Sequence, residues 1–175
     1  MTILCLAIVG KNNEPLYLCD CDFDKENKED SAVNEDDDIF GFASETTKGA
    51  ESALSLDNEF LMYAALDYLE EALGIHPGLP SRRQTGSHWI GYLCPMGDAK
   101  CYGYATATNA KFIAMATNDV SESKLKILFN SLHDLYVKHT MNPFSKIGGK
   151  IVSSQKFSQG VKDAVAEYKK SINQT

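Results

Sequence analysis

The sequence predicts an α+β fold in which helices pack on the faces of one antiparallel sheet. Three observations support this: five short apolar runs of strand composition, links of hairpin length between most of them, and three longer stretches of helical periodicity. Their order along the chain is β-β-α-β-β-β-α-α. One sheet covered by helices is the simplest arrangement that buries the apolar side of every helix.

The first two strands are expected at residues 2–9 and 15–19, where an Asn-rich turn separates two apolar runs. The first of these runs is apolar enough to resemble a signal peptide. It lacks the basic start and the small-residue cleavage pattern of one, so we interpret it as a buried strand of a cytosolic protein.

A first helix is expected from Asp57, which can cap it, to Leu73, because Gly74 then favours a helix end. The breaker-rich segment 75–87 indicates a loop. Three further strands follow, and their short links indicate an antiparallel meander; they are expected at residues 88–94, 100–107 and 110–117.

Two helices complete the chain, at about 119–139 and 154–171. The stretch from Asp119 to Glu122 resembles a capping box at the start of the former. Pro143 disfavours helical geometry at Asn142, so this helix is expected to end at or before that residue.

The negative charge is concentrated in one segment. The 175 residues carry a formal net charge of −7, but residues 20–51 alone carry −9 and the rest +2. The polar, aperiodic stretch 20–55 cannot bury enough apolar surface to offset its ordering entropy. We therefore expect one domain over 1–175 with a flexible acidic insertion. The absence of a concentrated basic face argues against nucleic acid as a ligand.

The motifs of common enzymes are absent. Neither G-x-S-x-G nor H-E-x-x-H occurs, and Gly148-Gly149-Lys150 lacks the rest of a phosphate loop. His139 falls on the apolar side of its helix, which favours a hydrogen-bonded core histidine over a catalytic base. We expect no enzyme activity and no cofactor. A hydrolase that assembles a cysteine and a histidine from distant positions stays open as an alternative.

The five cysteines do not form a regular framework. Their odd number favours free thiols in a reducing compartment over disulfides. A zinc site would have to combine Cys19-x-Cys21, Cys94 and Cys101 with His76 and His88. The paired C-x₂₋₄-C spacing of structural zinc sites is missing, so no metal is expected.

The first helix carries the most informative pattern. At about 100° per residue, one broad face is apolar, while the opposite side places Asp67 among Phe60, Tyr63 and Ala64 with Glu71 at the edge. Aromatic residues on an outward face are typical of protein interfaces. We favour an external partner over the alternative that the insertion folds back through "IFGF" at 39–42.

Two short motifs permit a structural and a signalling interpretation. The tripeptide Asn142-Pro143-Phe144 matches a ligand of endocytic adaptors, but its place between two amphipathic helices favours a structural role. Arg82 and Arg83 precede Thr85 as in basophilic kinase sites, and an ordinary solvated loop is the favoured interpretation.

The chain resembles small subunits of the TRAPP (trafficking protein particle) complex, of the sedlin family. The similarity covers about 1–19 and 57–171 and is carried by four passages: "NEFLMYAALDYLEE" (58–71), "WIGYLCP…CYGYATATNAKFIAM" (89–115), "DLYVKHTMNPF" (134–144) and "IVSSQKF" (151–157). The segments 20–55 and 75–87 are longer than the family pattern, which affects any interface using those connections.

The resemblance implies a longin-like, profilin-related fold, with a five-stranded antiparallel sheet, one helix on one face and two on the other. It also implies a cytoplasmic adaptor that associates peripherally with ER or Golgi membranes, binds other TRAPP subunits and indirectly supports nucleotide exchange on a Rab GTPase. Asp67 corresponds to an acidic residue of the family that is linked to partner binding. The alternative is a longin domain that regulates SNAREs, although the sequence up to Thr175 shows no heptad helix or membrane anchor.

Overall fold

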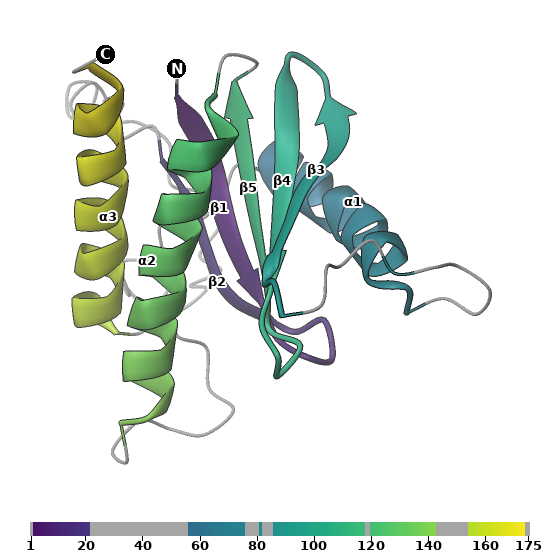
Figure 1. Ribbon diagram of the computed structural model, residues 1–175, viewed down its shortest axis with the longest axis horizontal. Helices are drawn as coiled ribbons and strands as arrows, with labels where there is room; N and C mark the ends of the chain where they lie inside the picture. The colour runs from purple at the N-terminus through teal and green to yellow at the C-terminus, as the bar shows by residue number, and fades with distance from the viewer. Residues whose placement is uncertain are drawn as a thin grey trace, which may run out of the picture.

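The computed structural model describes residues 2–21, 56–75, 81, 86–117, 120–142 and 154–173. Within these ranges one sheet separates helix α1 from helices α2 and α3 (Figure 1). The elements are β1 (Ile3–Val9), β2 (Pro15–Asp20), α1 (Leu56–Leu73), β3 (Trp89–Met96), β4 (Ala99–Ala105), β5 (Lys111–Thr117), α2 (Glu122–Thr140) and α3 (Gln155–Asn173). The α+β class, the order of the elements and the one-plus-two arrangement of the helices are therefore confirmed.

The sheet is antiparallel throughout, with the strand order β2-β1-β5-β4-β3. β1 pairs with both β2 and β5, so the N-terminal hairpin joins the meander at its last strand. The turn between β1 and β2 places Asn13 in the left-handed region, at φ 64°. Asparagine tolerates that conformation better than most residues, which explains the Asn-rich turn.

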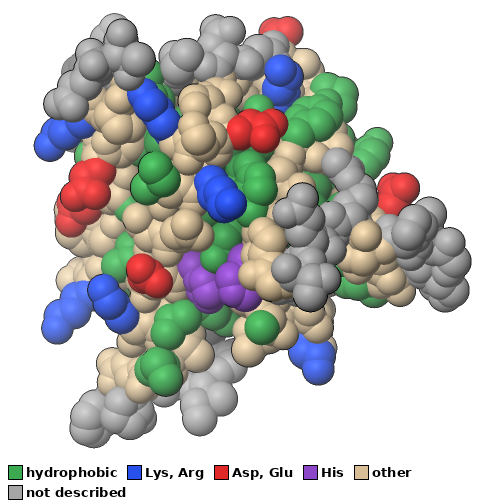
Figure 2. All heavy atoms as spheres, in the orientation of Figure 1, with side chains coloured by type: hydrophobic (Ala, Val, Ile, Leu, Met, Phe, Trp, Pro, Cys, Tyr) green, Lys and Arg blue, Asp and Glu red, His purple; other side chains and the backbone are tan. Residues whose placement is uncertain are grey.

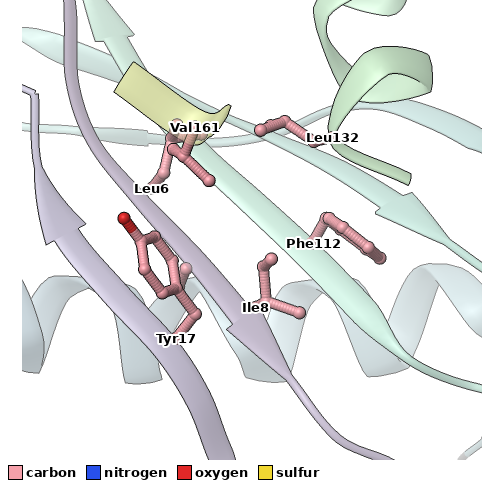
Figure 3. A pocket seen from close by; sticks show the side chains of 7 residues that line it. Leu6, Ile8, Tyr17, Phe112, Leu132 and Val161 are labelled. Atoms are coloured by element: carbon pink, nitrogen blue, oxygen red, sulfur yellow. The ribbon is translucent and has the colours of Figure 1, made fainter. Parts of the chain in front are cut away.

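Each face of the sheet carries its own hydrophobic core. The core on the α1 side includes Cys5, Leu69 and Ile113, whereas that on the α2/α3 side includes Phe112 and Phe129. Figure 3 shows a void in the second core, lined by Leu6, Ile8, Tyr17 and Phe112 from the sheet and by Leu132 and Val161 from the helices. The void has no room for a water molecule, so it is a packing defect and not a ligand site.

Two boundaries differ from the sequence prediction. α2 begins at Glu122 instead of near Asp119; Ser121 precedes it as the N-cap residue, and its side chain makes no capping hydrogen bond. β3 continues through Pro95 to Met96, beyond the predicted end at 94. Proline is tolerated there because β3 is an edge strand, whose outer backbone groups have no ladder partner.

Several predictions concern residues outside the described ranges. They include residues 22–55 of the acidic insertion with "IFGF", the basic pair Arg82 and Arg83 with Thr85, His76, and Pro143-Phe144 with the glycine pair that follows. α2 ends at Thr140, which agrees with the expectation that the helix stops at or before Asn142.

A candidate partner-binding surface on helix α1

Helix α1 is fixed to the sheet by residues at helical spacing. Its buried side chains are small or aliphatic and face β3 and β5: Met62, Ala65, Leu66, Leu69 and Ala72. The helix ends at Gly74, which has a φ of 70°. The amide of Ile75 donates to the carbonyl of Glu70 at 3.1 Å, and that of Gly74 to Glu71 at 3.0 Å, as in a Schellman motif.

Polar contacts fix both ends of the same helix. Near its start, the side-chain amide of Asn58 donates to the carboxylate of Asp20 at the end of β2, at 2.9 Å. Near its end, Glu70 forms an ion pair with Lys111 of β5. These contacts hold α1 in one position, so the residues on its outer side are presented on a rigid support.

The residues on the outer side form what we call the α1 outward surface: Phe60, Tyr63, Ala64, Asp67, Tyr68 and Glu71. The exposed fraction is 74% for Phe60, 48% for Tyr68 and 42% for Tyr63. Asp67 and Glu71 are also exposed, and Ala64 is half-buried. The structure thus brings together all five residues that periodicity placed on this side, with the carboxylate of Asp67 in the same stripe as the aromatic rings.

Tyr68 was not among the predicted residues. It lies four residues after Ala64 and eight after Phe60, so the same helical periodicity contains the signal.

The surface is acidic as well as aromatic. The sequence of α1 contains five carboxylates and no basic residue. Glu70 is neutralised by Lys111, which leaves Asp67 and Glu71 as exposed acids beside the rings. Such a surface suits a partner that offers apolar area together with a lysine or an arginine.

Asn142 lies elsewhere. It is exposed and follows α2, which covers the opposite face of the sheet from α1. Its amide donates to the carbonyl of His139 at 3.3 Å, so it contributes to the end of the helix and not to the α1 outward surface.

Within the described ranges the histidine of α2 with a side-chain hydrogen bond is His133, whereas the prediction named His139. Nδ1 of His133 and the hydroxyl of Tyr104 share a hydrogen bond of 2.9 Å. His139 is half-buried, and its ring packs edge-on against Phe157 at a centroid distance of 5.5 Å. The periodicity of α2 identified its inner side, but it could not tell which histidine meets a polar group on the sheet.

A histidine pair missed by the sequence lies on this side of the sheet. The rings of His88 and His133 are 5.2 Å apart, and Nδ1 of His88 donates to the carbonyl of Ala105 at 3.1 Å. Burial lowers the pKa of His133, and the nearby His88 lowers it further. Histidine side chains gather in one patch on the face shown in Figure 2, where the coloured acidic and basic side chains are interspersed.

This histidine pair borders a crevice of about 460 Å³, whose floor includes Leu16, Ala110 and Tyr136. The hydrogen bonds that hold the two imidazoles join His88 to the carbonyl of Ala105 and His133 to the hydroxyl of Tyr104. The arrangement orders the start of β3 against α2.

The cysteines do not assemble as a zinc site would require. Cys19 and Cys21 belong to the core on the α2/α3 side, and Cys94 and Cys101 to the core on the α1 side, so the sheet separates the two pairs. No group of three potential metal ligands occurs among the residues that the structure describes. In the same part of the chain, no helix is long and apolar enough to cross a membrane.

Comparisons with known proteins agree with this architecture. The family described as Sedlin matches residues 8–167. The chain is 35% identical over 165 residues to the trafficking protein particle complex subunit 2-like protein of Dictyostelium discoideum, covering 93% of this chain and 96% of that protein. It is 23% identical over 154 residues to the protein of the same name in Mus musculus, covering 86% and 88%. It is also 26% identical over 153 residues to a probable trafficking protein particle complex subunit 2 of Caenorhabditis elegans, covering 87% and 86%. With a match over most of its length, this chain belongs to the sedlin family of trafficking protein particle complex subunits.

Proposed function

We propose that this chain is a non-enzymatic assembly subunit of a trafficking protein particle complex and that it binds a neighbouring subunit through the α1 outward surface. The names of its relatives support membership in a multi-subunit complex. The observation that carries the proposed role of α1 is the high exposure of Phe60, with two further aromatic rings and an acid beside it.

The proposed mechanism assigns different tasks to the two kinds of residue. Phe60, Tyr63 and Tyr68 supply apolar area that is removed from water when the partner docks. Asp67 accepts hydrogen bonds from a lysine or arginine of the partner, which selects the partner and fixes its register. Because α1 is held at both ends, little conformational entropy is lost on binding.

The wider role follows from the complex and not from chemistry in this chain. In this proposal the subunit acts in ER-to-Golgi or intra-Golgi vesicle transport and reaches the membrane peripherally through its complex. It supports Rab GTPase nucleotide exchange by helping to assemble the complex that promotes it.

Affinity purification of the tagged chain from its native organism tests the proposal. We expect Phe60→Ala and Asp67→Arg to reduce the recovery of other complex subunits strongly. Truncation of an interface anchor costs about 2 kcal/mol, which weakens binding roughly 30-fold. The identities and amounts of the co-purifying proteins are measured by mass spectrometry.

Ile127 provides a matched control. It is 66% exposed, nearly as much as Phe60, but it belongs to α2 on the other side of the sheet. Ile127→Ala should leave the recovery of subunits unchanged. If Phe60→Ala and Asp67→Arg recover the same subunits as the unmodified chain while all variants are folded, the α1 outward surface is not the binding surface.

A further inference from the structure

Two thiols lie together where the chain leaves the edge of the sheet. Cys19 is in β2 and Cys21 follows it, and their sulfur atoms are 3.9 Å apart. Both side chains are buried beneath the α2/α3 layer. A spacing of two residues along an extended strand places both side chains on the same face, which explains why the sulfurs meet.

We propose that Cys19 and Cys21 form a redox-active dithiol that a peroxide oxidises to an intrachain disulfide. The two thiols face the other side of the sheet from α1, although Asp20 between them accepts the hydrogen bond from Asn58 at the start of that helix. The thiols are the substrate of the oxidation, and hydrogen peroxide is the oxidant.

The surroundings distinguish the two sulfurs. The pKa of Cys19 is lowered chiefly by a hydrogen bond with the Cys21 thiol. Burial and the charge of Asp20 oppose this, while a hydrogen bond from Tyr17 and the charge of Lys162 on α3 add to it. The pKa of Cys21 is raised, first by the same hydrogen bond and then by burial. The directions of these two pKa shifts, together with the 3.9 Å contact, favour Cys19 as the attacking sulfur and Cys21 as the resolving sulfur.

The local structure permits the closure. A disulfide needs a sulfur separation of about 2.05 Å, so the two side chains must approach by roughly 2 Å. Among the described strands β2 lies at the edge of the sheet and pairs with β1, and the amide of Cys21 donates to the carbonyl of Leu4 at 2.8 Å. Lys169 also donates to the carbonyl of Cys21 at 3.4 Å. Formation of the disulfide would strain these two hydrogen bonds of Cys21, which directly precedes the acidic stretch 22–55 of the sequence.

The reaction balances in two steps. The Cys19 thiolate attacks one oxygen of hydrogen peroxide, the O–O bond breaks, and after one proton is taken up the products are a sulfenic acid and water. The sulfur of Cys21 then attacks the sulfenic sulfur, and its proton leaves with the hydroxyl group as a second water. The two sulfurs lose two electrons in total, and the peroxide gains them.

A second cysteine pair serves as an internal control. Cys94 and Cys101 are directly opposed in β3 and β4 and interact through their thiols. Burial raises the pKa of both, to about 12 for Cys101, so neither has thiolate character near neutral pH. The proposal therefore requires that peroxide oxidise the pair Cys19/Cys21 in preference to the pair Cys94/Cys101.

Peptide mapping separates these pairs cleanly. The folded full-length chain is treated with hydrogen peroxide, its remaining thiols are alkylated, and it is digested with trypsin. Cleavage after Lys11 and Lys25 leaves both thiols of the proposed site in one peptide, whereas Cys94 and Cys101 fall in two peptides divided at Lys100. We expect the 12–25 peptide to lose two hydrogens and to escape alkylation, and Cys94 and Cys101 to be alkylated.

Variants test the assigned order of the two thiols. In Cys21→Ser the sulfenic acid of Cys19 should persist and be captured by dimedone. In Cys19→Ser no sulfenic acid should form at Cys21, so dimedone should not label that residue. Lys162 is a half-buried residue of α3 whose charge helps to lower the pKa of Cys19. Lys162→Gln should therefore slow the oxidation several-fold without replacing a core residue. The proposal is overturned if the 12–25 peptide of the folded chain stays fully alkylated, if the oxidation maps to Cys94 and Cys101 instead, or if Cys19 accumulates higher oxides without a disulfide.

Discussion

The ammonium nitrogen of Lys111 lies 2.7 Å from Oε1 of Glu70, and this ion pair joins the first strand position of β5 to the last turns of α1. The side chain of Lys111 is only 1% exposed and that of Glu70 14%. Lys111 also donates to the side-chain oxygen of Asn13 in the turn between β1 and β2. One buried cation thus connects α1, the centre of the sheet and the N-terminal hairpin.

We expect Lys111→Met to destabilise the protein by about 3 kcal/mol, because it leaves the carboxylate of Glu70 largely buried without its counter-ion. Replacing both partners, as in Lys111→Met with Glu70→Leu, should restore most of this loss, since no uncompensated charge then remains. The measurement is the free energy of unfolding in urea. Lys138→Met, at an exposed position of α2, should change it by less than about 0.5 kcal/mol. A small effect of Lys111→Met alone would show that the ion pair does not hold α1 to the sheet.

Glycine at position 103 allows α1 to approach the sheet closely. A Cβ atom added there would lie 2.7 Å from Cδ1 of Leu69 and 3.0 Å from Cδ1 of Leu93, both of which are buried. We expect Gly103→Ala to cost about 1–3 kcal/mol in the free energy of unfolding and to weaken subunit recovery by displacing α1.

Gly160 of α3 gives the contrasting case. The nearest atoms to a Cβ there would belong to the half-buried side chain of Leu135, the closest being Cδ2 at 3.0 Å. Alanine favours a helix over glycine by about 1 kcal/mol. Gly160→Ala should therefore be neutral or stabilising in the same urea assay. If both substitutions had equal cost, the close approach of Leu69 to β4 would not explain the glycine at 103.

The hydroxyl of Tyr168 is buried and has no hydrogen-bond partner within the described ranges. Burial raises the pKa of this side chain to about 12. Removing an unsatisfied buried hydroxyl relieves a desolvation cost, so we expect Tyr168→Phe to leave stability unchanged or to raise it by up to about 1 kcal/mol. Tyr104→Phe is the matched control, and it should lose about 1 kcal/mol because it deletes the hydrogen bond to His133. Differential scanning calorimetry of the two variants measures the difference, and a clear loss in Tyr168→Phe would show that the hydroxyl has a partner.

The local sequence pattern was sufficient to predict most of the strands and helices. The strands were placed within two residues because each is an apolar run between turn residues, such as Asn12-Asn13, and those signals are local. The start of α2 was placed three residues too early, because Asp119 and Glu122 have the spacing of a capping box although Ser121 precedes the helix. Spacing alone does not show which of several polar residues occupies the cap position.

The contacts that the sequence did not predict are those between distant residues. Lys111 is the buried first residue of the largely apolar strand β5, and no residue near it in the sequence indicates that its counter-ion is Glu70, 41 residues earlier. Likewise His88 directly precedes β3 and His133 lies in α2, so their contact depends on the packing of α2 over the sheet. Five of the six residues of the α1 outward surface, all except Tyr68, were predicted, because its members belong to one helix and share its periodicity.

The pH dependence of stability should report on the histidine pair. Burial and the neighbouring His88 lower the pKa of His133, whereas the charge of Asp134 raises it slightly. The folded state therefore favours the neutral imidazole, and the unfolded chain binds the proton at an ordinary pKa of about 6.5. Below that pH the unfolded state holds more protons than the folded state, so stability falls as the pH decreases, and above it this contribution is constant.

The free energy of unfolding in urea, measured across the acidic range down from pH 7, checks this expectation. Other groups also titrate there, so the informative quantity is the difference between the unmodified chain and His133→Gln, which should lose part of the slope just below pH 6.5. If His133→Gln and the unmodified chain show parallel curves, His133 is not held in its neutral form by the fold, and the packing of His88 against α2 does not depend on pH in this range.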